Sequence, residues 1–264
     1  MKSVLFYHVY MTEVASYWID IVEEQLKSME RGGMLNALSA LKVNAISRDP
    51  LEVEILDSMF RSYGIKCAKI TSIQNTFRTD YDMINNINQI PVSEGKTLSD
   101  IKEFCKTLPE NVAIGYIHTK GITAFKFLPP YGCNFEKYKV YKSWRHLLNK
   151  CVLEEWKDAH NHINNMGYDT SGAYLTKEPT LHYSGNFWWA QSNFINKLPD
   201  PADNTWWHDL KSKTSDHWLK HCPDRFKDEM WLCSSNGGEH IQTLNVGVQS
   251  PSTVYIPSDF LENL

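Results

Sequence analysis

The chain has 264 residues, of which 42% are hydrophobic and 22% charged, with a net charge of −4. This length can bury the core of one large domain, and the negative charge argues against broad nucleic-acid binding, which needs a basic face. No stretch approaches the ~20 apolar residues of a membrane span, and the short apolar N-terminus lacks the cleavage site of a signal peptide, so we expect a soluble, intracellular, cytoplasmic protein.

Strand-like apolar runs alternate with amphipathic helical stretches in the first half. The patterns predict strands and helices in the order 3–11, 16–35 (helix), 40–47, 51–64 (helix), 65–73, 96–109 (helix) and 111–121. Thr97 or Ser99 is the expected N-cap of the third helix. The alternation is typical of an α/β fold with a mostly parallel sheet flanked by helices.

The run 111–121 ends in His118, Thr119, Lys120 and Gly121. In parallel α/β sheets, ligands bind outside the carboxyl ends of the strands. These residues are therefore candidates for ligand binding. A polar turn that merely ends the strand is the alternative.

The second half is less regular. It contains a predicted helix at 138–167 with a break possible in its middle, and then the segments 168–175 and 182–198, the second of which includes a strand with Trp188 and Trp189. A loop near 199–209, a helix-like stretch at 224–235 and a β-like tail at 252–257 follow. No repeat, low-complexity run or interdomain linker divides the chain. We predict a single domain over 1–264, with a nucleotide-side half and an irregular second half.

Signals for metals and disulfides are weak. Asp80 and Asp82 have the Asp-x-Asp spacing that binds a divalent cation on a diphosphate. They lie in a polar stretch and do not follow an apolar strand, so we predict that metal dependence does not rest on them. His160 and His162 would point apart on a helix.

The six cysteines lack zinc-ligand spacing and are interpreted as reduced thiols rather than disulfides: Cys67, Cys105, Cys133, Cys151, Cys222 and Cys233.

The stretch HYSGNFWWA, residues 182–190, combines a flexible turn with two tryptophans. Ser184-Gly185-Asn186 would let the backbone approach a ligand closely. Trp188 and Trp189 point to opposite faces of a strand, so one could pack in the core while the other stacks on a sugar. The alternative is that both are core tryptophans.

An acidic pair, Asp228 and Glu229, precedes an apolar helical stretch. A carboxylate held there could take a proton from a hydroxyl group. The alternative is a stabilising interaction with the helix dipole.

The order of these features resembles nucleotide-sugar-dependent glycosyltransferases of the GT-A fold. More narrowly, YIHTKG, SWR and HYSGNFWWA resemble motifs of bacterial, algal and chlorella-virus glycosyltransferases, over residues 3–235. The resemblance implies a GT-A-like domain whose residues 1–125 bind the nucleotide sugar and whose residues 126–264 bind the acceptor. In a virus, the protein would act in the host cytoplasm.

The resemblance also implies roles for individual residues. In the GT-A fold the fourth strand usually ends in an Asp-x-Asp metal motif, where this chain has His118-Thr119-Lys120. Lys120 would neutralise the departing diphosphate, and His118 would add a hydrogen bond or a metal ligand, which leaves the need for Mn²⁺ or Mg²⁺ open. The other donor-side candidates are His8 and Tyr10, near the base, and Arg145, on a phosphate or in a salt bridge. The cleft candidates are His182, Ser184, Gly185, Asn186 and Trp188.

Glu229 or Asp228 matches the general base of an inverting enzyme. We expect transfer of a sugar from a nucleoside-diphosphate donor to a hydroxyl of a glycan or glycoprotein, and the resemblance alone suggests UDP-xylose as donor. A carbohydrate-binding module and a nucleotide-sugar hydrolase are the alternatives, although Lys120 and the acidic pair would have no function in a lectin.

Overall fold

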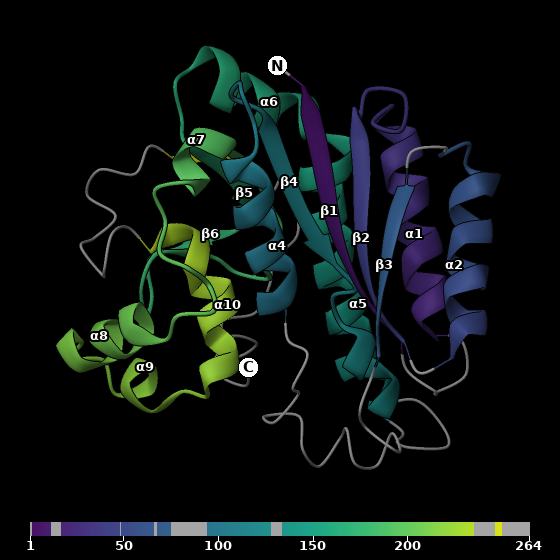
Figure 1. Ribbon diagram of the computed structural model, residues 1–264. Coiled ribbons are helices and arrows are strands. Elements are labelled where there is room, and N and C mark those ends of the chain that lie inside the picture. The colour runs from purple at the N-terminus through teal and green to yellow at the C-terminus, as the bar shows by residue number, and fades with distance from the viewer. Residues whose placement is uncertain are drawn as a thin grey trace.

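A seven-stranded sheet forms the centre of the described chain, in the order β3-β2-β1-β4-β8-β5-β9 (Figure 1). The computed structural model describes residues 2–11, 17–47, 49–65, 68–74, 94–127, 134–234 and 246–249. Strands β1 (Ser3–Tyr10), β2 (Ala40–Ser47), β3 (Ala68–Gln74) and β4 (Ala113–His118) are parallel. The predicted α/β fold with a mostly parallel sheet flanked by helices is therefore confirmed.

The second half adds short strands of mixed direction. Strand β8 (Trp188–Gln191) is antiparallel to both β4 and β5 (Thr170–Ala173), and β9 (Val246–Gln249) runs parallel to β5. Beside this sheet, β6 (Leu175–Thr176) and β7 (His182–Tyr183) form an antiparallel pair. In the sheet, the antiparallel β8 lies between β4 and β5 and so joins the parallel strands to the short strands of the second half.

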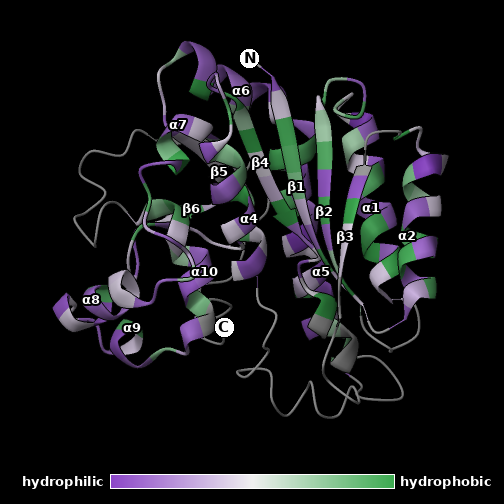
Figure 2. Cartoon of the chain, viewed as in Figure 1, coloured by the Kyte–Doolittle hydropathy of each residue, from purple (hydrophilic) through white to green (hydrophobic). Residues whose placement is uncertain are grey.

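Helices cover both faces of the sheet (Figures 1 and 2). One face packs against α1 (Tyr17–Arg31), α2 (Pro50–Ser62), α5 (Phe135–Asn149), the π-helical turn Lys150–Glu154 and α6 (Trp156–Asn165). The other packs against α4 (Gly95–Lys106), α7 (Ser192–Ile195), α8 (Thr205–Lys213), α9 (His217–His221) and α10 (Lys227–Met230). Short 3₁₀ turns occupy Ile122–Phe127, Asp224–Phe226 and Trp231–Cys233.

The side-chain alternation of the strands divides the core between these two faces. On β1, Leu5 and Tyr7 join one core cluster, while Phe6 joins the other. Trp188 and Trp189 separate in the same way, and both are 0% exposed. The structure therefore corrects the prediction that Trp188 lines a cleft, because both indole rings are core residues.

The predicted elements of the second half have different outcomes. The stretch 138–167 breaks into α5, the π-helical turn and α6, which confirms the predicted interruption. The loop near 199–209 becomes helical at Thr205, where α8 begins. The helix predicted at 224–235 is a series of single turns around α10. The β-like tail at 252–257 lies outside the described residues.

The predicted N-cap of α4 is wrong. The helix begins at Gly95, so both Thr97 and Ser99 lie inside the helix and not before it. The hydroxyl of Ser99 donates to the carbonyl of Gly95 (2.9 Å), and that of Thr97 is hydrogen-bonded to side chains of β1 and β2. The N–H of Gly95 donates instead to Oδ2 of Asp228 (2.9 Å), a partner that local sequence patterns do not reveal.

Cys105, Cys151, Cys222 and Cys233 are free and buried, as predicted, whereas Cys67 and Cys133 lie outside the described residues. Within the described ranges, every helix is too short or too polar to cross a membrane.

Candidate functional site

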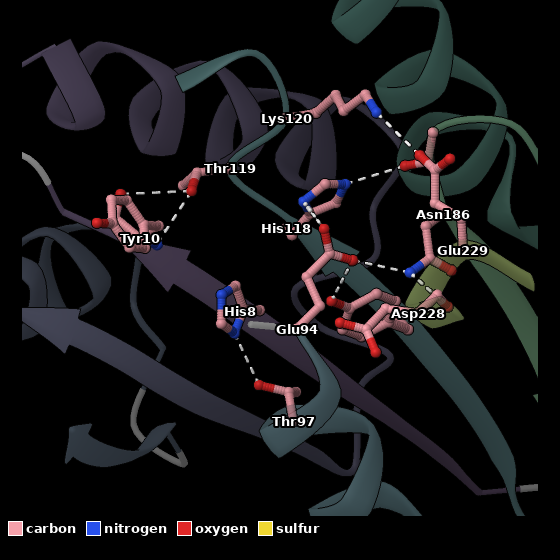
Figure 3. Close-up of polar contacts among 12 residues, drawn as sticks. His8, Tyr10, Glu94, Thr97, His118, Thr119, Lys120, Asn186, Asp228 and Glu229 are labelled. Carbon is pink, nitrogen blue, oxygen red and sulfur yellow. Dashed lines mark hydrogen bonds and ion pairs between the residues drawn. The ribbon is translucent and has the colours of Figure 1, made fainter. Parts of the chain in front are cut away.

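Strands β1 and β4 end side by side at the carboxyl edge of the sheet (Figure 3). His8 and His118 are register partners, and the N–H of Thr119 donates to the carbonyl of His8 (3.1 Å). The hydroxyl of buried Thr119 accepts from the N–H of Tyr10 (3.0 Å). The predicted neighbours are thus together, but the Thr119 hydroxyl and the Tyr10 backbone tie the two strand ends to each other.

Glu94, which the sequence analysis missed, lies at the centre of this edge. It directly precedes α4, and its Oε1 is 3.0 Å from Nδ1 of His118. Its Oε2 accepts from the hydroxyl of Tyr116 (2.9 Å) and from Nδ2 of Asn186 (2.8 Å). Burial raises the pKa of this carboxyl, but the charge and hydrogen bond of His118, with His8 and Lys120, outweigh burial and hold the pKa well below its usual range.

His118 lies between two oxygen acceptors. Its Nε2–H donates to the carbonyl of Gly185 (3.0 Å), while Nδ1 faces the carboxylate of Glu94. Both ring nitrogens of His118 therefore face oxygen acceptors of the protein itself. Neither nitrogen is therefore positioned to bind a metal or a phosphate, which corrects both roles predicted for His118. In the described ranges, no three His, Cys, Asp or Glu side chains gather where they could hold a metal ion. Asp80 and Asp82 lie outside those ranges.

The Ser184-Gly185-Asn186 segment is a tight turn. The N–H of Asn186 donates to the carbonyl of Tyr183 (2.9 Å), and φ is 89° at Gly185 and 55° at Asn186. A Cβ at Gly185 would lie 2.7 Å from Cδ1 of Leu148. The close approach that this glycine allows is therefore to the protein's own core. Buried Ser184 donates its N–H to the carbonyl of Tyr174 (3.0 Å).

Asn186 connects this turn to the acidic residues. Its Nδ2 donates to Glu94 and, at 3.3 Å, to the carbonyl of Asp228. Its Oδ1 accepts from Nε1 of Trp188 (2.8 Å). Asn186 is almost fully buried, so it acts as part of the wall of the site.

The acidic pair on α10 divides into two different environments. Asp228 is buried, and its Oδ2 caps α4 through Gly95 (2.9 Å). Glu229 places Oε1 3.2 Å from Nζ of Lys120, and the two side chains are 19% and 14% exposed. Burial raises the pKa of Glu229, Lys120 and His182 lower it, and the net result is a pKa below the usual value.

Two further histidines of this edge are buried, and burial disfavours their charged forms. Nδ1–H of His182 donates to the carbonyl of Thr180 (2.8 Å), and burial lowers its pKa. Nδ1 of His8 is 2.9 Å from the hydroxyl of Thr97, and burial lowers the pKa of His8 to about 4. Burial thus works against a charge on either histidine, and Lys120 supplies cationic charge to the described part of this cluster.

Arg145 contacts the backbone of Lys120. Its Nε and Nη2 donate to the two carboxylate oxygens of Glu24 (3.0 and 2.9 Å), and its Nη1 donates to the carbonyl of Lys120 (3.2 Å). The neighbouring Gly121 has φ of 76°. With its side chain 2% exposed, Arg145 matches the salt-bridged alternative and not the predicted phosphate contact.

The comparisons with known proteins give one family. No curated protein matches the chain. Among solved structures, it is similar to the crystal structure of 4-diphosphocytidyl-2C-methyl-D-erythritol synthase from Anaerococcus prevotii DSM 20548, with 9% identity, coverage of 99% of this chain and 93% of that chain, and a TM-score of 0.33. The model of the domain of unknown function DUF8361 matches residues 6–236, so the chain belongs to the DUF8361 family.

Proposed function

We propose that this protein is a GT-A-like glycosyltransferase that moves a sugar from a nucleoside-diphosphate donor to a hydroxyl of a glycan. One observation carries the proposal: Lys120 and Glu229, 109 residues apart in the chain, meet at 3.2 Å at the carboxyl edge of the parallel strands. A single displacement at an anomeric carbon needs a cation for the leaving group and a base for the attacking hydroxyl. This pair supplies both in one place.

In the proposed reaction, the acceptor oxygen forms a bond to the anomeric carbon while the bond from that carbon to the diphosphate oxygen breaks. The hydroxyl proton moves to Glu229, and the bonding electron pair leaves with the nucleoside diphosphate. The Lys120 ammonium offsets the charge that develops on the leaving oxygen. Direct displacement inverts the configuration of the sugar.

Glu229 suits the role of base better than the two neighbouring carboxylates. Both oxygens of Glu94 already interact with protein groups. Asp228 is buried and caps α4. The carboxylate of Glu229 is partly exposed, and Lys120 is its only ion-pair partner among the described residues.

A donor screen tests the proposal. The protein is incubated with UDP-, GDP- and CMP-sugars, beginning with UDP-xylose, with and without oligosaccharide acceptors, and in Mg²⁺, Mn²⁺ or EDTA. Nucleotide release that requires an acceptor supports transfer. Equal release without an acceptor identifies a hydrolase, and sugar binding without release identifies a binding module.

Lys120→Ala should lower the transfer rate by roughly 10²–10³-fold, because the leaving group loses its cation. Lys106→Ala is the matched control, since Lys106 pairs with Glu103 in the last turn of α4. Steady-state rates are measured for both variants after circular dichroism has established that they fold. Wild-type kinetics in Lys120→Ala would refute the role of this lysine.

A further inference from the structure

Lys120 and Glu229 neutralise each other in the free protein. The proposed function, on which this inference rests, needs the same lysine for the diphosphate and the same glutamate for the acceptor proton. As long as the two are paired, neither group is available for its task. The donor must therefore replace Glu229 at Lys120 before the reaction begins.

We propose that Glu229 occupies the diphosphate's place at Lys120 in the free protein, and that donor binding releases Glu229 to act as the base by exchanging this ion pair. The site would then be active only when a donor is present. The ligand that drives the exchange is a diphosphate group.

The geometry of the pair favours exchange. Lys120 and Glu229 have a single contact of 3.2 Å, and both side chains are partly exposed. The neighbouring pair of Arg145 and Glu24 is bidentate, and Glu24 is also 3.0 Å from Nε2 of His146. A single-contact pair that is partly exposed is exchanged more readily than a bidentate pair, and a diphosphate brings more than one negative charge to the same ammonium group.

Charged and titratable groups from several elements surround Glu229. Lys120, after β4, and His182, on β7, lower the pKa of Glu229, whereas burial and Glu94, before α4, raise it. Tyr116 on β4 is neutral, since burial raises its pKa well above the usual value. On the chain around α10, Asp228 caps α4, and Asp224 accepts from Trp207 and pairs with Lys211.

When Lys120 turns to a diphosphate, Glu229 loses the strongest of the charges that stabilise its ionised form. Burial and the negative charge of Glu94 then act with less opposition, and both raise its pKa. A carboxylate of higher pKa is a stronger base. The exchange would thus strengthen the base at the moment when a sugar is in place.

Calorimetric titration with inorganic pyrophosphate at constant ionic strength tests the exchange without relying on turnover. The proteins are wild type, Glu229→Gln, Lys120→Gln and the double variant, with Asp224→Asn as a control that removes an exposed carboxylate of the same region. We expect Glu229→Gln to bind pyrophosphate about 3- to 10-fold more tightly, because the competitor for Lys120 is gone. Lys120→Gln should weaken binding by about 10-fold or more, and the double variant should match it within about twofold.

The outcomes separate this inference from the proposed function. If wild type binds through Lys120 but Glu229→Gln binds no more tightly than Asp224→Asn does, the exchange is wrong and the diphosphate site stands. If the wild-type protein does not bind pyrophosphate, both the exchange and the proposed diphosphate site are wrong.

The pH profile of transfer gives a second measurement. The acidic limb of kcat/KM reports the free enzyme, and that of kcat reports the enzyme with donor bound. Exchange predicts that the limb of kcat lies at higher pH, by at least about half a unit. If Lys120 had only a structural role, the acidic limbs of kcat and kcat/KM would fall at the same pH. That result would overturn the inference.

Discussion

Glu94 shows at the scale of one residue how the site is held together. Its carboxylate receives contacts from His118 and Tyr116 on β4 and from Asn186 in the turn before β8. No sequence pattern marks this residue, because a glutamate before a predicted helix ordinarily suggests only an interaction with the helix dipole. The functional partners of such a residue are set by distant segments, here up to 92 residues away.

Glu94→Gln should therefore destabilise the protein by about 1–3 kcal/mol, since the amide cannot replace the charged contact with His118. Urea denaturation at neutral pH measures the change in the free energy of unfolding. Glu103→Gln is the control on the same helix, and its exposed pair with Lys106 should contribute less than about 1 kcal/mol. Equal effects of the two variants would contradict the central position of Glu94.

The two acidic residues of α10 should have different effects when each is replaced by its amide. Asp228→Asn weakens the cap of α4 and should lower stability by about 1 kcal/mol. Glu229→Gln should keep the fold and lose most of the transfer rate, because an amide cannot take a proton. Melting temperatures and transfer rates of both variants make the comparison. Transfer near the wild-type rate in both would place the base elsewhere.

At the scale of elements, the sequence predicted what short-range patterns determine. The strands β1, β2 and β4 are apolar runs, and the helices α1 and α2 have apolar residues at helical spacing. All five elements lie within a few residues of their predicted bounds. The four-residue strands β5 and β8 are too short to show a period, and their antiparallel pairing depends on tertiary contacts. The cap of α4 comes from a residue 133 positions away.

The turn before β8 gives an element-scale prediction. Gly185→Ala would place a Cβ 2.7 Å from Cδ1 of Leu148 at a φ of 89°, and should destabilise the protein by about 2 kcal/mol or more. Gly33→Ala is the matched control, because its φ is 66° but no atom lies within 4 Å of the added Cβ. This control should cost only about 1 kcal/mol. Chemical denaturation of both variants is the measurement, and an equal loss would refute the packing argument.

At the scale of the whole molecule, buried histidines make stability depend on pH. Burial lowers the pKa of His8 and of His160 to about 4. The unfolded chain binds protons on these histidines near pH 6.5, whereas the folded chain binds them only near pH 4. The unfolded state therefore holds more protons between these values, and the free energy of unfolding falls as pH drops from about 6.5 to 4.

His8→Gln should make this decline shallower, by on the order of 1–3 kcal/mol over the window. Urea unfolding of wild type and variant at pH 7, 6 and 5 measures the slope. His217→Gln serves as the control, since His217 is exposed on α9. A slope that stays the same in His8→Gln would show that the buried imidazole is not responsible.

The two long-range contacts of α10, one hydrogen bond and one ion pair, also have a kinetic consequence. Asp228 to Gly95 and Glu229 to Lys120 join segments 133 and 109 residues apart. Closing loops of that length costs chain entropy before any contact forms, so these contacts follow the assembly of the sheet during folding. An interaction that is absent from the folding transition state affects only the rate of unfolding. The stability lost in Asp228→Asn should thus appear as faster unfolding with an unchanged rate of refolding.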